Sequence, residues 1–163
     1  MPDCRFTSAC AAGLLLLSLA ARSDEVTSVA LATGQYGMRK EIPHSMGLEL
    51  QLRPPWRWHV IRPVAGILTS SQGAAFVYSG LAFELDLPAG VRLTPGFAPG
   101  VVLSKGEGDL GSLVEFRSSL ELSVAAWYRL RIGVGLSHIS NGRLGVHNPG
   151  VEVLEVGISF PRN

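Results

Sequence analysis

Residues 114–124, Val-Glu-Phe-Arg-Ser-Ser-Leu-Glu-Leu-Ser-Val, alternate between apolar and polar side chains at almost every step. Because successive side chains of a β-strand point to opposite faces, this stretch predicts a strand with one apolar face and one charged face. Residues 128–136, Tyr-Arg-Leu-Arg-Ile-Gly-Val-Gly-Leu, repeat the pattern directly downstream. The two stretches together predict neighbouring strands of one sheet.

The same period of two recurs along the chain between turn residues. We predict strands near residues 27–34, 46–52, 59–69, 74–85, 90–104, 113–127, 128–140 and 151–160. Eight strands of about ten residues each are the pattern of a small outer-membrane barrel. The predicted fold class is therefore all-β, an eight-stranded antiparallel outer-membrane β-barrel.

Charges of both signs gather on one parity of these strands. Glu115, Arg117, Arg129 and Arg131 all oppose the apolar parity of their strands. Such charges can pair inside a narrow barrel while the apolar parity faces lipid, so we interpret the four residues as structural groups of the lumen. A soluble eight-stranded barrel with the two faces exchanged, such as a lipocalin-like binder, gives similar alternation and stays an alternative.

Aromatic residues favour the membrane barrel over the soluble one. Trp56, Trp58, Trp127 and Tyr128 stand beside predicted turns at one end, as an interfacial girdle requires. The last predicted strand closes on Phe160, three residues before the end of the sequence, and an apolar final strand is common in bacterial outer-membrane barrels.

The connections show the asymmetry of such barrels. With a periplasmic N-terminus, the periplasmic turns are short and the outer loops are mostly long. The short turns lie at residues 53–57, at 86–89 and near 127, and the outer connections at 35–45, 70–73, 105–112 and 141–150, with 70–73 a short exception.

Residues 1–23 predict a secretory signal peptide. Arg5 precedes an apolar run over residues 9–21, and small residues follow, so we expect cleavage between about 20 and 24. The alternative is a buried N-terminal helix. Cleavage leaves residues 24–163 as a single barrel domain. Both cysteines, Cys4 and Cys10, fall in the signal, so the mature chain has no thiol for a disulfide, a nucleophile or a metal.

Composition excludes several other classes. The 163 residues carry a formal net charge of only +1, whereas nucleic-acid binding usually shows a strongly basic face. No stretch of the mature chain approaches twenty uninterrupted apolar residues, which argues against a helical membrane protein. Residues 106–109, Gly-Glu-Gly-Asp, lack the ligand count and spacing of a calcium loop. We expect no metal and no cofactor.

Three reactive groups share the lipid-facing parity at the outer end. His138 and Ser140 continue the apolar parity of residues 128–136, and Glu152 shares the parity of Leu154 and Val156. Opposed residues on adjacent antiparallel strands lie roughly 5 Å apart, so the three groups can converge. A hydroxyl, an imidazole and a carboxylate are the triad of a serine esterase, and on a lipid-facing wall such an esterase should act on lipid.

Each feature of this region also has a structural explanation when taken alone. A His-x-Ser pair can be a hydrogen bond at the rim, and Asn148-Pro149-Gly150 can be a simple turn. His147 fits a solvated loop better than a phosphate ligand, and Arg143 fits a soluble loop or a contact with anionic lipid equally well. The combination on one parity and at one rim is what favours a catalytic site.

The segment His138-x-Ser140-Asn141, followed by Asn148-Pro149-Gly150-x-Glu152, resembles the signature of the bacterial lipid A 3-O-deacylase family, of the PagL type. That resemblance implies an eight-stranded outer-membrane barrel that removes the 3-linked acyl chain of lipopolysaccharide. It makes Ser140 the nucleophile, His138 the base and Glu152 the acid of a triad.

The resemblance also covers the oxyanion site. It implies Asn148 as a donor to the oxyanion, with Asn141 and Gly142 as supporting residues. The second donor of the family is a loop glycine, and here Gly142 and Gly145 flank the matching position, which holds Arg143. The second donor is therefore left open.

The sequence thus predicts a Gram-negative outer-membrane serine esterase acting on lipid A or lipopolysaccharide. Its expected partners are that substrate and outer-membrane lipid, and no nucleic acid is expected. Whether the protein forms a homodimer is left open. The rival from another class is a non-catalytic small barrel with an adhesion or structural role, which predicts no dependence on Ser140.

Overall fold

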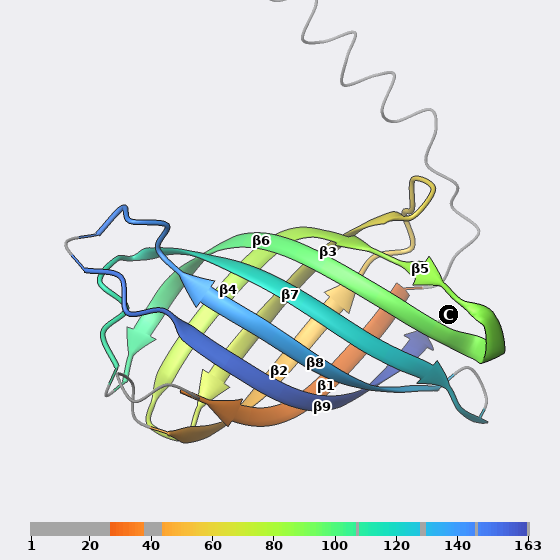
Figure 1. Cartoon of the computed structure of the whole chain (residues 1–163), viewed down its shortest axis with the longest axis horizontal. Helices are drawn as coiled ribbons and strands as arrows, with labels where there is room; N and C mark the ends of the chain where they lie inside the picture. The colour runs from red at the N-terminus through yellow and green to blue at the C-terminus, as the bar shows by residue number, and fades with distance from the viewer. Residues whose placement is uncertain (1–26, 38–43, 107, 128–129, 146, 163) are drawn as a thin grey trace, which may run out of the picture.

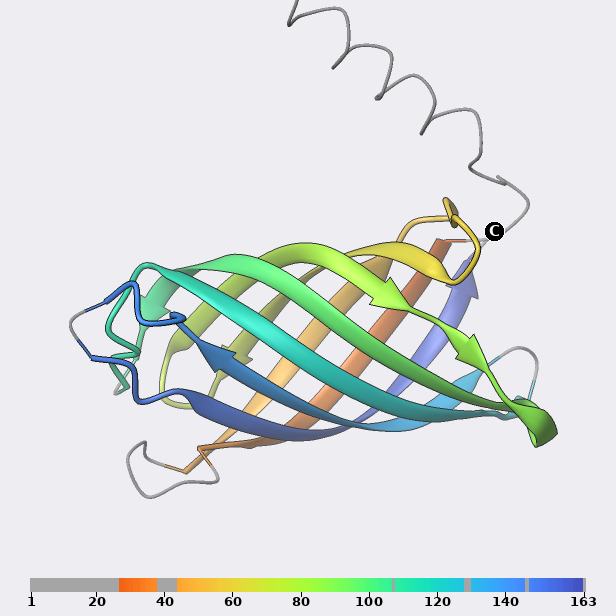
Figure 2. The same ribbon diagram turned by 45° about the horizontal axis from the view of Figure 1, so that its top comes forward.

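Eight long antiparallel strands wrap into a closed barrel in the computed structural model (Figures 1 and 2). The structure describes residues 27–37, 44–106, 108–127, 130–145 and 147–162. The predicted signal peptide lies outside these residues. The elements are β1 (Thr27–Tyr36), β2 (Ser45–Arg53), β3 (Ile61–Ser70), β4 (Ala74–Phe83), β5 (Leu85–Asp86), the short 3-10 turn η1 (Pro88–Gly90), β6 (Val91–Lys105), β7 (Val114–Ala125), β8 (Arg131–Ser140) and β9 (Val151–Arg162).

Each long strand pairs with the next long strand, and the pairing of the first with the last closes the ring. β1 pairs with β9, and β4 pairs with β6, so the sheet has no open edge between its long strands. The two-residue β5 only extends the hairpin at the start of β6. The predicted eight-stranded antiparallel barrel is confirmed. No helix within the described residues has the length and apolar character needed to cross a membrane.

Some strands begin later or end earlier than predicted, because the residues at their ends form turns. β3 begins at Ile61, later than predicted, because Trp58 and Ile61 exchange two backbone hydrogen bonds of 2.9 Å across a tight turn. β7 ends at Ala125, because the following residues belong to a turn in which the Leu130 N–H donates to the Trp127 carbonyl at 3.0 Å.

The period of two separates the outer wall from the lumen, as the alternation predicted. Along β8, Leu136 is 50% exposed while the next residue, Ser137, is buried. Leu136 pairs with Leu154 on one side and with Leu120 on the other, and all three are exposed apolar side chains. The outer wall is therefore an apolar surface suited to lipid.

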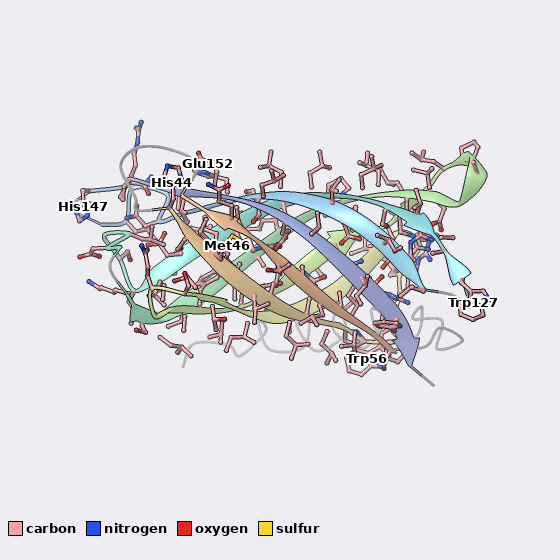
Figure 3. All side chains as sticks on the ribbon, turned by 90° about the horizontal axis from the view of Figure 1, so that it is seen from below. His44, Met46, Trp56, Trp127, His147 and Glu152 are labelled. Carbon is pink, nitrogen blue, oxygen red and sulfur yellow. The ribbon has the colours of Figure 1, made fainter. Side chains whose placement is uncertain are left out.

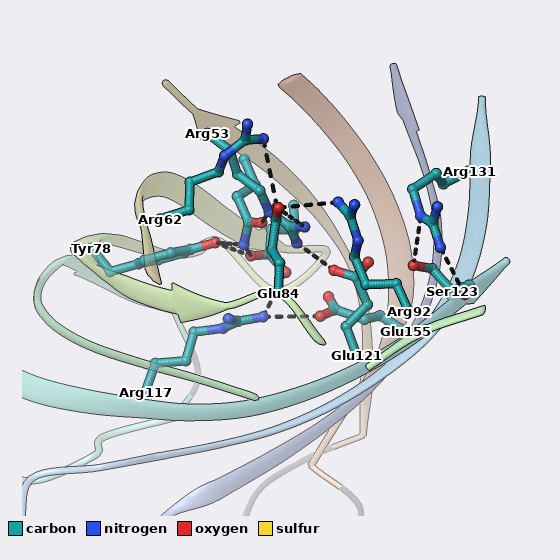
Figure 4. A network of polar contacts seen from close by, with 12 residues as sticks. Arg53, Arg62, Tyr78, Glu84, Arg92, Arg117, Glu121, Ser123, Arg131 and Glu155 are labelled. Atoms are coloured by element: carbon teal, nitrogen blue, oxygen red, sulfur yellow. Dashed lines mark hydrogen bonds and ion pairs between the residues drawn. The ribbon is translucent and has the colours of Figure 1, made fainter. Parts of the chain in front are cut away.

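The lumen near the turns is filled by ion pairs (Figure 4). The buried carboxylate of Glu84 lies within 3.1–3.8 Å of four guanidinium groups, those of Arg53, Arg57, Arg62 and Arg92. Further along, Arg117 Nη2 contacts Glu49 Oε2 at 3.0 Å and Glu155 Oε1 at 2.9 Å, and its guanidinium lies 5.0 Å from the ring centre of Tyr78. Glu115, Arg117 and Arg131 all face the lumen side as predicted, while Arg129 lies outside the described residues.

Toward the opposite end the lumen changes from polar to apolar. A buried cluster there includes Phe76, Val102, Ile139, Val151 and Val153. Ile139 and Val153 are almost fully buried, with 2% and 0% of their surface exposed. The wall that carries the predicted triad on its outside is thus backed by packed side chains on its inside.

Glycines in the strands make room for the aromatic rings of the lumen. A Cβ on Gly66 would lie 2.4 Å from the hydroxyl oxygen of Tyr78, and a Cβ on Gly100 would lie 2.4 Å from the ring of Phe76. Both distances are far below van der Waals contact. The rings can therefore lie against the backbone of the neighbouring strand and fill the narrow lumen.

The two ends of the barrel differ in chemistry (Figure 3). Trp56 and Trp127, both exposed, lie at the end that holds the short turns, and Glu152, His44 and His147 lie at the other end. We call the latter the outer end. The predicted aromatic end is therefore separated from the predicted site by the length of the barrel, although Tyr128 is not among the described residues.

Arg117→Leu should destabilise the barrel, because the carboxylates of Glu49 and Glu155 lose the cation that they share. Breaking a buried ion pair leaves an uncompensated charge, and we expect a loss of about 3–5 kcal/mol in the free energy of unfolding. Urea titration in lipid vesicles, followed by the electrophoretic shift between folded and unfolded barrel, measures it. Arg143→Leu, at an exposed position of the outer loop, is the control and should change little. Equal stability of the two variants would contradict this account of the lumen.

Candidate active site

His138 and Glu152 face each other across β8 and β9 on the outer wall. They are direct partners in the register, and His138 Nδ1 lies 3.3 Å from Glu152 Oε1. The His138 side chain is 45% exposed and that of Glu152 only 16%. A carboxylate on Nδ1 fixes the orientation of an imidazole and leaves Nε2 for another partner.

Ser140 lies on the same face two residues further along β8. The intervening Ile139 is buried in the lumen, so the alternation of the strand holds His138 and Ser140 on the outside together. Across from Ser140 on β7 lies Phe116, whose ring stacks on Phe97 with 6.0 Å between the ring centres. The structure therefore places all three predicted triad residues on one patch of the outer wall.

Gly150 makes space for the free edge of the imidazole. It precedes Val151, the partner of Ile139, and so faces Ser140 one step further along the two strands. A Cβ on Gly150 would lie 2.7 Å from Cε1 and 3.3 Å from Nε2 of His138. The Cε1–Nε2 edge of the imidazole therefore lies over Gly150, next to the strand position of Ser140. This role could not be predicted from the sequence, where Asn148-Pro149-Gly150 alone is typical of a turn.

Asn141 is the centre of the loop that follows β8. It is fully buried, and its Nδ2 donates to the carbonyls of Leu110 and His147, each at 2.8 Å. Its Oδ1 accepts the Arg143 N–H at 2.8 Å. Asn141 therefore ties the β8–β9 loop to the β6–β7 loop, which is a role that its place in the sequence motif did not reveal.

Asn148 is oriented by the backbone of Asn141. Its Oδ1 accepts the Asn141 N–H at 3.0 Å. Because the oxygen of the amide is engaged there, the Nδ2 group points the other way and can donate to a bound substrate. This geometry supports the assignment of Asn148 as an oxyanion donor.

Arg143 lies at the position that matches the loop glycine of the resembling family, and it has a backbone conformation that glycine favours. Its φ is 70°, Gly142 before it has φ 60°, and the Leu144 N–H donates to the Asn141 carbonyl at 3.0 Å to close the turn. The Arg143 N–H, however, already donates to Asn141. Arg143 therefore adopts a conformation that glycine favours, and its N–H is used within the loop.

Asp109 belongs to the neighbouring β6–β7 loop. The backbone N–H of Gly111 and the ammonium group of Lys105 hold the pKa of Asp109 below its usual value. Among the residues that the structure describes, no group of three or more His, Cys, Asp and Glu side chains could hold a metal ion.

A family model matches most of the chain. The model of the lipid A 3-O-deacylase (PagL) family matches residues 44–161. No curated protein sequence matches the chain.

Solved structures show the same fold. The crystal structure of the outer membrane enzyme PagL matches with a TM-score of 0.64 and 19% identity, over 83% of this chain and 99% of that chain. Neisserial surface protein A matches with a TM-score of 0.60 and 11% identity, over 87% and 99%. A de novo designed transmembrane β-barrel matches with a TM-score of 0.58 and 10% identity, over 87% and 99%.

Structural matches at identities this low show the barrel fold alone. The family match, in contrast, runs from β2 into β9 and includes every residue of the site. The chain belongs to the lipid A 3-O-deacylase (PagL) family of outer-membrane β-barrel hydrolases.

Proposed function

We propose that the protein hydrolyses the 3-O-linked acyl chain of lipid A in the outer membrane of a Gram-negative bacterium, with Ser140, His138 and Glu152 as its triad. The observation that carries the proposal is the His138–Glu152 contact of 3.3 Å on an apolar wall. A carboxylate on a lipid-facing surface has a high energetic cost unless it is paired, and such residues usually serve a function. Here it is paired with an imidazole two residues from a serine.

The reaction follows ordinary acyl transfer. Ser140 Oγ attacks the ester carbonyl while His138 Nε2 accepts its proton, and Glu152 stabilises the imidazolium. Asn148 Nδ2 donates to the oxyanion that forms on the carbonyl oxygen. His138 then protonates the sugar oxygen as the ester bond breaks, and a water molecule activated by the same imidazole releases the fatty acid from Ser140.

The position of the site fits a substrate that stays in the membrane. The catalytic groups lie on the outside of the barrel at its outer end, so a lipid can reach them sideways without entering the lumen (Figure 3). All of these groups come from one chain, and the proposed reaction does not require a second copy. A homodimer stays a prediction.

A non-catalytic barrel is the second candidate, because the fold that the chain shares with Neisserial surface protein A does not by itself require a catalytic site. That function needs no carboxylate and imidazole paired on the lipid-facing wall. It also gives no reason for a buried asparagine that orients Asn148 toward the same patch. The arrangement of the site therefore favours the hydrolase.

Ser140→Ala should remove nearly all deacylation, by about 10⁴-fold or more, as loss of a triad nucleophile does in other serine hydrolases. Mass spectrometry of lipid A incubated with the refolded protein measures the loss of the acyl chain. Ser79→Ala is the control, because Ser79 is an exposed serine of β4 on the same outer wall. A folded Ser140→Ala barrel that still deacylates lipid A would overturn the mechanism.

Glu152→Gln should lower turnover by about 10²–10⁴-fold, because the amide cannot stabilise the imidazolium and favours the wrong tautomer. The stability of the barrel should change little, since Glu152 is not part of the lumen network. Initial rates on lipid A and urea unfolding of the same samples give both quantities. Asp109→Asn removes a carboxylate at the same end and is the matched control. Wild-type turnover in Glu152→Gln would exclude this carboxylate as the acid.

A further inference from the structure

We propose that His44 and Gln35 form the subsite that holds the sugar headgroup of the substrate, on the side of Glu152 away from His138. This inference rests on the proposed function and adds to it the direction in which the substrate lies. Both side chains are exposed at the outer end, and Gln35 Nε2 lies 3.2 Å from His44 Nδ1. Four observations carry the inference.

The first observation is that His44 lies in the same row of residues as the catalytic pair. His138 faces Glu152 in the register, and the Gly37 N–H donates to the Glu152 carbonyl at 3.1 Å. Gly37 and His44 are one step beyond the last register pair of β1 and β2, Tyr36 and Ser45. The row therefore runs across four strands from His138 through Glu152 and Gly37 to His44.

The second observation is that the residue between Glu152 and His44 in this row is Gly37, which has no side chain of its own. Outward parity follows from the neighbours: Tyr36 is buried, Gln35 and Met46 are exposed, and His44 shares their side. For a ligand held at Glu152 and His138, His44 is therefore the next outward-facing side chain along the row. Figure 3 places Glu152 and His44 at the same end of the barrel.

The third observation is that the row climbs toward the outside of the membrane as it approaches His44. β1 ends at Tyr36, in register with Val153 and, through it, with Ser137 of β8 and Ser119 of β7. Beyond these partners β8 continues to Ser140 and β7 reaches back to Val114. The ends of these strands meet at one end of the barrel. A row that reaches the end of β1 therefore lies below the ends of β8 and β7, and it rises from β7 to β1.

The size of this rise matches the chemistry of a lipid. Strands about 4.8 Å apart and tilted by about 40° raise a row by roughly 3 Å at each step. His44, two strands from Glu152, then lies about 6 Å above it. A sugar lies above the ester that it carries, so His44 is at the height of the headgroup. In the other direction the row descends through Ser118 to Phe97, an exposed aromatic side chain on the apolar wall.

The fourth observation concerns the hydrogen-bonding capacity of the pair. The Gln35 amide nitrogen can only donate, so its contact of 3.2 Å with His44 Nδ1 selects the tautomer that carries the proton on Nε2. His44 Nε2 is therefore a donor held in place by Gln35. Its natural partner in the substrate is an acceptor oxygen, which a sugar hydroxyl, an amide carbonyl or a phosphate of the headgroup supplies.

Steady-state kinetics of the full-length refolded protein test the assignment. The substrates are purified lipid A in detergent micelles, the same lipid A after enzymatic removal of its phosphates, and a p-nitrophenyl ester with a short acyl chain. The variants are His44→Ala and Gln35→Leu. His147→Ala is the matched control, since His147 is also an exposed imidazole of the outer loops but lies near the Asp109 carbonyl, at 3.3 Å, outside the row.

We expect His44→Ala to raise KM for lipid A by about five- to tenfold with little change in kcat, the effect of one lost hydrogen bond. Gln35→Leu should raise it less. The short ester, which has no sugar, should be hydrolysed by both variants as by the wild type. An effect that disappears on dephosphorylated lipid A identifies the phosphate as the acceptor, and one that persists identifies the sugar or its amide.

An unchanged KM in His44→Ala, or an equal rise in His147→Ala, would overturn the subsite and leave the proposed function intact. A loss of short-ester hydrolysis in His44→Ala would also overturn it, because the residue would then act on the chemistry. A wild-type protein that leaves lipid A intact would overturn the proposed function and this inference together.

Discussion

Closure of the sheet is the constraint on which the rest of the structure depends. The pairing of β4 with β6 and of β1 with β9 gives every long strand a hydrogen-bonding neighbour on both sides. Inside a membrane this is required, since no water is present to satisfy an open edge. Once the ring is closed, the two-residue period of each strand assigns every side chain either to lipid or to a narrow lumen.

The lumen then determines how rigid the site can be. Arg117, shared by Glu49 and Glu155, and Glu84, surrounded by four arginines, fill the centre and the turn end with paired charges. At the outer end, Ile139 and Val153 pack into an apolar cluster directly behind His138 and Glu152. The pair is therefore presented on strands whose inner face is fixed. This is the support that a catalytic site on a lipid-facing wall needs, because its outer side contacts only mobile lipid and substrate.

Most of the barrel could be predicted because alternation is a local signal. The parity of His138, Ser140 and Glu152 followed from their neighbours in the sequence, and the register of β8 and β9 confirms that His138 and Glu152 are partners. The exact ends of the strands could not be predicted, because turn hydrogen bonds such as that between Leu130 and Trp127 depend on backbone geometry. The role of Asn141 could not be predicted, since its contacts with Leu110 join loops 31 residues apart. The space above Gly150 and the place of His44 in the same row as His138 and Glu152 likewise arise only when the strands are in register.

The central claim is that an imidazole and a carboxylate on the outside of the barrel activate Ser140. Labelling with an alkyl fluorophosphonate, followed by peptide mass spectrometry, tests this most directly, because the reagent modifies only activated serines. The account predicts one adduct, on the peptide that contains Ser140, and its disappearance in His138→Ala. No adduct in the folded wild-type protein, or an adduct on another serine, would contradict the account.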